Sequence, residues 1–149
     1  NYKIILFFLI FLQFNSLLFF NFKSHPVQMV YFNYFGKFLS NDMPKDYWGM
    51  ANHIALKKLL DLDKSDKIKI SVSSYSYLKN STTFFSMDEK NRLHIFGTNQ
   101  KNESDYIFTN YYFNKDPLFE KKYIIPENFY PYTNLIINGI KINEIFKRK

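Results

Sequence analysis

The 149-residue chain contains no cysteine, which excludes disulfide bonds, a thiolate nucleophile and a metal site with cysteine ligands. Its four glycines are isolated, so the glycine-rich loop that binds phosphate groups is absent. Among the three histidines, His25, His53 and His94, no two have the spacing of zinc ligands. The sequence also has no G-x-S-x-G motif or other local signature of a catalytic nucleophile. We therefore predict no metal site, no cofactor and no catalytic residue in this chain.

Arginine is also scarce. Arg92 and Arg148 are the only two, although the formal net charge is +7. The lysines are dispersed among thirteen acidic residues and form no basic block. A basic surface attracts nucleic acid or anionic lipid, and the dispersed pattern favours lipid. We expect no nucleic-acid partner; a soluble nucleic-acid binder stays an alternative, which extraction without detergent and salt-sensitive retention on RNA or DNA would favour.

The N-terminus of the chain contains an unusually long apolar stretch. Residues 4–20 read IILFFLIFLQFNSLLFF and carry no charge. With Tyr2 and Phe22 the stretch reaches about twenty residues, the length that crosses a bilayer core. We predict that residues 1–22 form a transmembrane helix; a signal peptide and a buried core helix are the alternatives. Residues 17–23 lack the small side chains of a signal-peptide cleavage site.

The next segment, residues 23–45, is rich in aromatic side chains and also contains basic ones. Such mixtures are typical of membrane–water interfaces, and Pro26 prevents a simple continuation of the preceding helix. We predict an interfacial connector over these residues, followed by a soluble domain over residues 46–149.

The soluble part begins with its best helix, which we predict over residues 46–62. Asp46 is a candidate N-cap whose charge suits the positive end of the helix dipole. Apolar residues recur at spacings of three and four and predict one buried stripe: Met50, Ala51, Ile54, Ala55, Leu59 and Leu62. Polar residues define the opposite, solvated face: Asn52, His53, Lys57 and Asp61. We interpret His53 as a surface histidine and not as a metal ligand or catalytic base.

Alternating and continuous apolar patterns predict a small sheet. Residues 67–73 alternate and indicate a strand with one buried face, and residues 92–96 indicate a second, shorter strand. Residues 105–109 have consecutive apolar side chains, as strands buried on both faces do. The Asn-Gly dipeptide within residues 135–146 is the strongest short signal for a hairpin.

The remaining segments carry weaker signals. Residues 75–88 fit either a short helix or an irregular turn. Residues 98–104 and the proline-containing residues 111–132 are predicted as loops, and residues 147–149 as a solvated tail. The predicted fold class is α/β: one N-terminal transmembrane helix, then a small domain with one main helix on a mixed sheet that ends in a β-hairpin.

Two carboxylates, Asp42 and Asp46, follow the membrane segment and lie near the expected interface. One interpretation gives them a role as general acid or base. Helix capping and loop hydrogen bonding are the interpretation that we prefer.

Two motifs carry a family resemblance. HPVQMVYFN at residues 25–33 follows the apolar segment, Gly36 comes next, and DYWG at residues 46–49 opens the predicted helix. This arrangement resembles the C-terminal region of bacterial polytopic membrane glycosyltransferases of the GT-C type, which are similar to dolichyl-phosphate-mannose–protein mannosyltransferases. In that family a D-Y-V-type strand and a closing hairpin come later, where residues 105–107 and the Asn-Gly turn stand here.

The resemblance implies a transferase that takes a sugar from a polyprenyl-phosphate carrier. The acidic residue thought to act in such enzymes lies in an early extramembrane loop, and no segment of this chain matches it. The resemblance therefore implies the C-terminal end of such an enzyme, without the catalytic centre and with its domain on the non-cytoplasmic side of the cell membrane. Because the chain opens with asparagine and not methionine, we expect a fragment whose membrane helices continue upstream.

From the resemblance we expect these residues at the interface with the membrane core: His25, Gln28, Tyr31, Asn33, Asp46 and Trp48. The first four belong to the junction motif, and the last two would anchor the first helix of the domain. The expected partners are the lipid bilayer, the upstream transmembrane region of the same polypeptide and a lipid-linked sugar. The alternative is a single-pass, membrane-anchored protein with a non-enzymatic binding or scaffolding domain.

Overall fold

A computed structural model of the chain describes residues 2–25, 28, 38, 40, 45–46, 48–112 and 121–149. These residues fall into two compact units, Asn1–Tyr31 and Phe32–Lys149. Most of the connector predicted over residues 23–45 lies outside the described residues, as do Tyr31 and Asn33 from the expected interface set and the carboxylate of Asp42.

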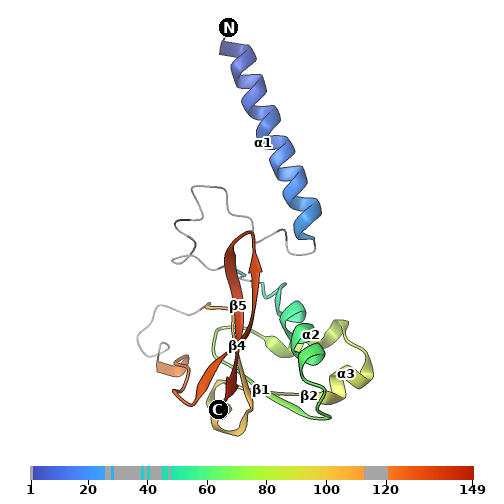
Figure 1. Cartoon of the computed structure of the whole chain (residues 1–149), viewed down its shortest axis with the longest axis vertical. Coiled ribbons are helices and arrows are strands. Elements are labelled where there is room, and N and C mark those ends of the chain that lie inside the picture. Colours follow the sequence, from blue (N-terminus) through green and yellow to red (C-terminus); the bar gives the residue numbers. More distant parts are fainter. Residues whose placement is uncertain are drawn as a thin grey trace. The chain divides into compact units, whose positions relative to one another are not determined.

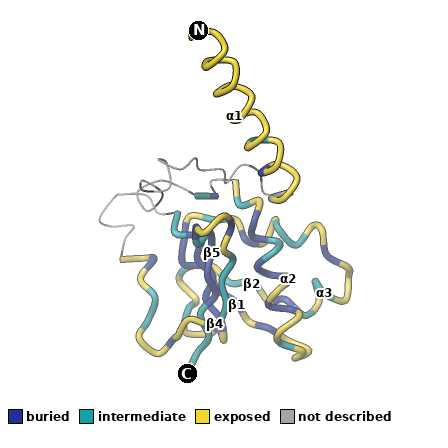
Figure 2. The backbone as a smooth tube through the Cα atoms, turned by 45° about the horizontal axis from the view of Figure 1, so that its top comes forward, coloured by how far each residue is buried: buried dark blue, intermediate teal, exposed yellow. Residues whose placement is uncertain are grey.

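The first unit contains the helix α1, Tyr2–Ser24 (Figure 1). Among the described residues it is the one helix whose length and composition suffice to cross a membrane, over Tyr2–Lys23. Its apolar side chains are exposed along nearly its whole length (Figure 2). Asn15 and Asn21 donate their side-chain amides to carbonyls one turn earlier, at 2.7 Å and 2.9 Å. Part of their polar surface is therefore satisfied within the helix, as an apolar environment requires.

The second unit is built around a five-stranded mixed sheet in the order β2-β1-β3-β5-β4. Its strands are β1 (Ile68–Val72), β2 (Leu93–Phe96), β3 (Tyr106–Thr109), β4 (Phe129–Ile137) and β5 (Ile140–Arg148). β1 is parallel to both β2 and β3, and β5 is antiparallel to β3 and β4. The predicted class is confirmed: a long apolar N-terminal helix precedes an α/β domain that ends in a hairpin (Figure 1).

The hydrophobic core lies between one face of this sheet and the helix α2, Asn52–Leu62. Figure 2 shows buried residues in α2 and in the strands beside it. The core includes these residues of α2 and of the strands β1 and β3: Ala55, Leu56, Leu59, Leu60, Ile68, Ile70, Val72, Tyr106 and Phe108. Every residue of β3 is buried, which confirms the prediction that this strand is covered on both faces.

The main helix begins later than the predicted residue 46, and its buried side differs from the predicted stripe. Gly49 has a φ of +67°, a conformation outside the right-handed helical region, so the helix begins only at Asn52. Met50 and Leu62 are exposed although both belong to the predicted stripe. The buried residues of the helix are Asn52, Ala55, Leu56, Leu59 and Leu60. Periodicity assigns a polar Asn52 to the solvated face, and for this reason it misplaces the stripe.

The hairpin forms where the Asn-Gly dipeptide predicts it. Asn138 and Gly139 have φ angles of 52° and 80°, as the two central residues of a type I′ turn do. Its strands are longer than the predicted residues 135–146, since β4 already begins at Phe129. The predicted loop over residues 111–132 is therefore wrong at its end, and residues 113–120 lie outside the described part.

The C-terminal residues 147–149 are not the solvated tail that their basic composition predicts. Lys147 and Arg148 pair with β4, and the Lys149 amide donates to the Asn128 carbonyl at 2.9 Å. Because β4 extends to Phe129, the basic end of β5 still has a strand to pair with.

Short helices replace the irregular segments. The undecided residues 75–88 form the 3₁₀ helix η3 (Leu78–Phe84) and the start of α3 (Met87–Arg92). The predicted loop over residues 98–104 contains a second 3₁₀ helix, η4 (Thr98–Glu103).

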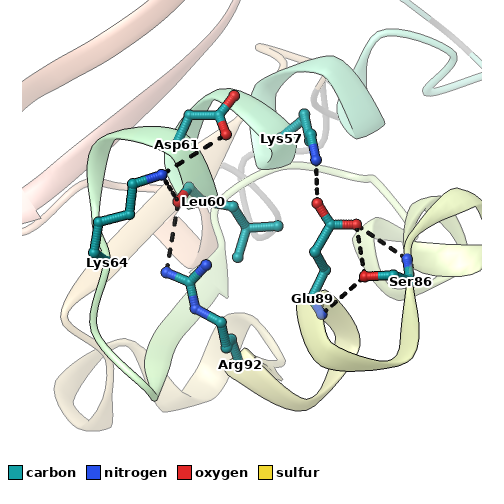
Figure 3. Close-up of polar contacts among 7 residues, drawn as sticks. All are labelled: Lys57, Leu60, Asp61, Lys64, Ser86, Glu89 and Arg92. Atoms are coloured by element: carbon teal, nitrogen blue, oxygen red, sulfur yellow. Dashed lines mark hydrogen bonds and ion pairs between the residues drawn. The ribbon is translucent and has the colours of Figure 1, made fainter.

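Polar contacts fasten α3 to α2 (Figure 3). Ser86 caps α3 in a reciprocal capping box with Glu89, and the Glu89 carboxylate also binds the Lys57 ammonium of α2. At the last turn of α2, the Leu60 carbonyl accepts from Arg92 at 3.5 Å and from Lys64 at 3.4 Å. Carbonyls at a helix end have no partner within the helix, so these two cations stabilise the C-terminus of α2.

Candidate functional site

The carboxyl ends of the parallel strands β1 and β3 meet at one edge of the sheet. We name this the carboxyl edge; it comprises residues 45–46, 48–52, 73–77 and 109–112 and residues 134–144 of the β4–β5 hairpin. The connection from β1 leads to β2 on one side, whereas β3 lies on the other side of β1. Ligands of open α/β sheets bind at such switch points, outside the carboxyl ends of the strands. A ligand site of this domain is therefore expected at the carboxyl edge.

The turn that precedes α2 is organised by Asp46. One carboxylate oxygen accepts the Met50 amide at 2.9 Å and the other accepts the Ala51 amide at 2.8 Å. The Asp46 carbonyl accepts the Gly49 amide at 3.2 Å. The observed N-cap is Ala51, which makes no side-chain capping bond. The predicted N-cap is thus wrong in position, because Asp46 binds the amides that come just before the first helical residue.

Gly49 is required by the same turn. Its φ of +67° disfavours any residue with a Cβ. A Cβ atom at this position would also lie 2.6 Å from the side-chain nitrogen of Asn52. Both the backbone conformation and the close approach of Asn52 therefore exclude a larger residue, and this explains why glycine follows Trp48 in the DYWG motif.

Three asparagines connect this turn to the rest of the edge. The Asn110 side-chain amide donates to the Asp46 carbonyl at 3.3 Å, and that of Asn143 to the Ala51 carbonyl at 3.3 Å. The Asn52 side-chain amide donates to the Ser76 hydroxyl at 2.8 Å. All three asparagines are at most 1% exposed. They hold the turn, the helix start, the loop after β1 and the hairpin in one buried polar network.

Two acceptors of this network have no partner among the described residues. They are the side-chain oxygens of Asn52 and Asn143; Asn52 follows Ala51 in the sequence, and Asn143 donates to the Ala51 carbonyl. A buried acceptor without a donor is destabilising, so these two oxygens are the polar atoms of the network that lower its net contribution to stability.

A second polar group lies beside the network. The Tyr111 hydroxyl donates to the Glu144 carboxylate, and the Lys141 ammonium binds the same carboxylate at 3.0 Å. Tyr111 has a φ of 58°, which is uncommon for a residue with a Cβ. The Lys45 ammonium lies 5.4 Å from the centre of the Tyr111 ring, within the range of a cation–π interaction.

Burial decides the protonation behaviour of this edge. It raises the pKa of the Asp46 carboxyl above its ordinary value of 3.8, although the amides of Ala51, Met50 and Gly49 and the nearby His53 oppose the shift. Burial, followed by repulsion from Lys141, lowers the pKa of Lys45. Since both Asp46 oxygens are bound by backbone amides and its exposure is 4%, this carboxyl acts as a structural acceptor. This geometry fits the role that we prefer for Asp46, which is hydrogen bonding at the start of the helix.

The expected interface residues are distributed over both units. In the first, the His25 ring nitrogen Nδ1 lies 2.8 Å from the Gln28 amide nitrogen, which also approaches the Asn21 carbonyl at 3.4 Å. In the second, Asp46 and Trp48 share one turn but differ in burial, because Trp48 is 72% exposed. The asparagines of the network are missing from the expected set, since a polar residue in an amphipathic pattern indicates solvent exposure.

The opposite edge differs in chemistry. We name it the amino edge; it comprises residues 63–67 and 103–106 and the end of β5. A surface hollow of about 330 Å³ lies there, with walls that include Asp63, Lys67 and Lys149. Arg148 is engaged with the carbonyls of Ser104, Lys101 and Asn102. The lining contains two acidic residues and four basic ones, and two of the basic side chains are engaged elsewhere: Arg148 with the carbonyls given above and Lys147 with the rings of Tyr106 and Tyr132.

No group of three or more potential metal ligands occurs among the residues that the structure describes. No protein-family model, curated protein or solved structure matches this chain.

Proposed function

We propose that this chain is the C-terminal part of a polytopic membrane glycosyltransferase that takes its sugar from a polyprenyl-phosphate carrier. The observation that carries the proposal is the turn at Asp46. The DYWG motif is one of the two on which the resemblance rests, and Asp46 and Gly49 both have specific geometric roles in that turn. A motif whose residues are fixed in this way supports a family relation better than a chance run of letters.

The properties of α1 support the membrane part of the proposal. Its length and composition suit a bilayer span, and its exposed apolar surface would be costly in water. In this proposal α1 is the last transmembrane helix, and the second unit is an extramembrane domain on the non-cytoplasmic side. His25 and Gln28 then belong to the junction that meets the membrane core.

The second unit serves this enzyme as a structural domain in the proposal. The Asp46 carboxylate is occupied by two backbone amides, and Glu144 by Tyr111 and Lys141. The two buried carboxylates of the carboxyl edge are therefore not available as acids or bases. The catalytic acid is expected upstream, and this domain stabilises the enzyme or shapes the entrance for the acceptor.

The coding sequence upstream of Asn1 gives the first test. The proposal expects further membrane spans and an acidic extramembrane loop in the same reading frame. A natural start codon directly before Asn1 would contradict it. The second test is transfer of a radiolabelled sugar from polyprenyl-phosphate-linked mannose or glucose in membranes that contain the full-length protein. Gly49→Ala should lower this transfer together with the amount of folded enzyme, whereas Gly97→Ala should change neither; full-length membranes that consume neither carrier would contradict the assigned donor class.

A single-pass anchored protein with a binding or scaffolding domain is the second candidate. The described residues contain one span, and an exposed aromatic surface lies at the carboxyl edge. The two candidates differ in the upstream sequence, because only the glycosyltransferase needs additional helices. A short upstream region without spans would favour the second candidate.

A further inference from the structure

An exposed apolar surface lies at the carboxyl edge of the second unit and extends to the end of η3. It consists of five residues: Trp48, Met50, Tyr75, Tyr77 and Phe84. We name it the apolar rim. Trp48, Tyr77 and Phe84 are 72%, 75% and 75% exposed. Large aromatic side chains with this exposure are unusual on a soluble surface, and contiguous apolar patches mark interaction sites.

Contacts show that the rim residues are neighbours and not a scatter over the surface. The loop that holds Tyr75 and Tyr77 is tied to α2 through the bond from Asn52 to Ser76. The Phe84 ring lies 5.6 Å from the ring of His53 in the first turn of α2. Trp48 and Met50 belong to the turn that leads directly into this helix. The rim therefore surrounds the N-terminus of α2.

The charges near the rim favour a lipid surface. The two acidic residues of the described part of this edge, Asp46 and Glu144, are 4% and 5% exposed, so neither presents a carboxylate to an approaching membrane. Lys79 is exposed beside the rim. At the amino edge, by contrast, exposed acids such as Asp66 and Asp105 are mixed with exposed lysines such as Lys67. Tryptophan and tyrosine with a neighbouring lysine are typical of a protein surface at the headgroup level, and the nearest exposed acid in sequence, Asp88, follows Phe84 in the first turn of α3.

The position of the rim in the chain points to the same partner. Lys45, Asp46 and Trp48, which precede α2, belong to the carboxyl edge. About twenty residues separate α1 from this point, and they span roughly 70 Å at most. If α1 is in a bilayer, the domain is held within this distance of the membrane, and a tether of this kind makes even a weak surface interaction effective.

We propose that the apolar rim lies in the headgroup region of the bilayer in which α1 is inserted. The proposal rests on the membrane insertion of α1 that the proposed function includes. Trp48, Tyr75 and Tyr77 then lie at the membrane–water interface, and Met50 and Phe84 lie on the apolar side of that interface. The amino edge faces water.

Trp48 is the sole tryptophan of the chain, so its fluorescence reports this surface directly. The full chain is reconstituted in vesicles of phosphatidylcholine and phosphatidylglycerol, with or without lipids brominated near the headgroups. We expect the brominated lipids to remove most of the Trp48 emission, and aqueous iodide to quench it weakly. The matched control is the W48F/Y130W variant, which moves the indole to β4 near the amino edge; there we expect strong quenching by iodide and little by brominated lipid.

A rim variant, Y75S/Y77S, retains Trp48 but removes two neighbours. We expect it to reduce quenching by brominated lipid and to increase quenching by iodide, while Ile124→Ser outside the rim changes neither. If the chain stays in the vesicles at alkaline carbonate but Trp48 and the Trp of the control are equally accessible to iodide, the rim proposal is wrong. If alkaline carbonate releases the chain, the membrane insertion and hence the proposed function fail as well.

Discussion

The two edges of the sheet use the same chemistry in opposite surroundings. At the carboxyl edge, Asp46 accepts two backbone amides in a buried turn, and burial raises its pKa. At the amino edge, Asp63 accepts the Ser65 amide at 2.8 Å and the Tyr106 hydroxyl at 2.7 Å. Burial raises the pKa of Asp63 as well, but the hydrogen bonds from Ser65 and Tyr106 outweigh it and lower the pKa overall.

The tyrosine–carboxylate pairs repeat this contrast. Tyr111 binds Glu144, which is buried, whereas Tyr106 binds the half-buried Asp63. Hydrogen bonds alone therefore do not distinguish the edges; access to water does. The carboxyl edge combines a buried polar network with an exposed aromatic rim, and the amino edge has solvated charges. This division agrees with our proposal that the carboxyl edge meets a membrane and the amino edge faces water.

Glycine substitutions should give the largest effects. Gly49→Ala should lower the free energy of unfolding by about 2–3 kcal/mol, because it adds positive-φ strain and an overlap with Asn52. Gly139 also has a positive φ, but a Cβ atom there would lie in open space. We therefore expect Gly139→Ala to lower the free energy of unfolding by about 1 kcal/mol. Gly97 has neither a positive φ nor a close neighbour at its Cβ position, so the free energy of unfolding of Gly97→Ala should stay within about 0.5 kcal/mol of the wild-type value. Urea unfolding of the full chain in detergent micelles measures all three, and equal values for Gly49 and Gly97 would refute the turn geometry.

The two edges should respond differently to loss of an aspartate. Asp46→Ala leaves the amides of Met50 and Ala51 without their acceptor, and we expect a loss of about 2 kcal/mol. Asp66→Ala removes an exposed carboxylate at the amino edge and should cost less than about 0.5 kcal/mol. The same urea titration compares them. A cost for Asp46→Ala as small as that for Asp66→Ala would mean that water reaches the turn.

Removing one hydroxyl at each edge sharpens the comparison. Tyr111→Phe deprives the buried Glu144 of a donor and should lower the free energy of unfolding by about 1.5 kcal/mol. Tyr106→Phe should cost about 1 kcal/mol or less, because Asp63 keeps its bonds from Ser65. Denaturant unfolding of the two single variants tests the order. The reverse order would show that access to water does not set the difference.

The smallest effects should appear in the pH dependence. A lowered folded pKa means that Asp63 stabilises the fold above its ordinary pKa of 3.8 and that this contribution is lost as the pH falls below it. A raised folded pKa has the opposite consequence: the contribution of Asp46 declines as the pH rises from 3.8 to the folded value.

The free energies of unfolding of Asp63→Asn and Asp46→Asn, measured between pH 3 and pH 7, distinguish these two pH dependences. The stability difference between wild type and Asp63→Asn should grow as the pH rises toward 4, with most of the change near or below the ordinary pKa of 3.8. The difference for Asp46→Asn should shrink as the pH rises above 3.8. Two differences that change in the same direction would contradict the contrast between the edges.

Local patterns predict much of this fold. The alternation in residues 67–73 and the apolar run in residues 105–109 identify β1 and β3, because burial imposes these patterns on strands. The Asn-Gly dipeptide identifies the turn of the hairpin, because both residues tolerate positive φ. These features depend on neighbouring residues alone, so the sequence contains enough information for them.

The network at the carboxyl edge depends on long-range contacts, and the sequence pattern does not reveal it. Asn52 and Asn143 are buried because they bind Ser76 and the Ala51 carbonyl, partners that are distant in the sequence. A periodicity argument places each of them in solvent. Gly49 did offer a signal, since a glycine near a candidate N-cap warns that the helix starts later. The roles of Tyr31 and Asn33 stay predictions, because both residues lie outside the described part.

Hydrogen exchange tests the contrast between the edges most directly. The amides of Ala51 and Ser65 each donate to an aspartate at 2.8 Å, but Ala51 is buried and Ser65 is exposed. In the full chain we expect the Ala51 amide to exchange much more slowly than that of Ser65, and Asp46→Ala to abolish this protection. Equal exchange of the two amides in the wild type would contradict the account.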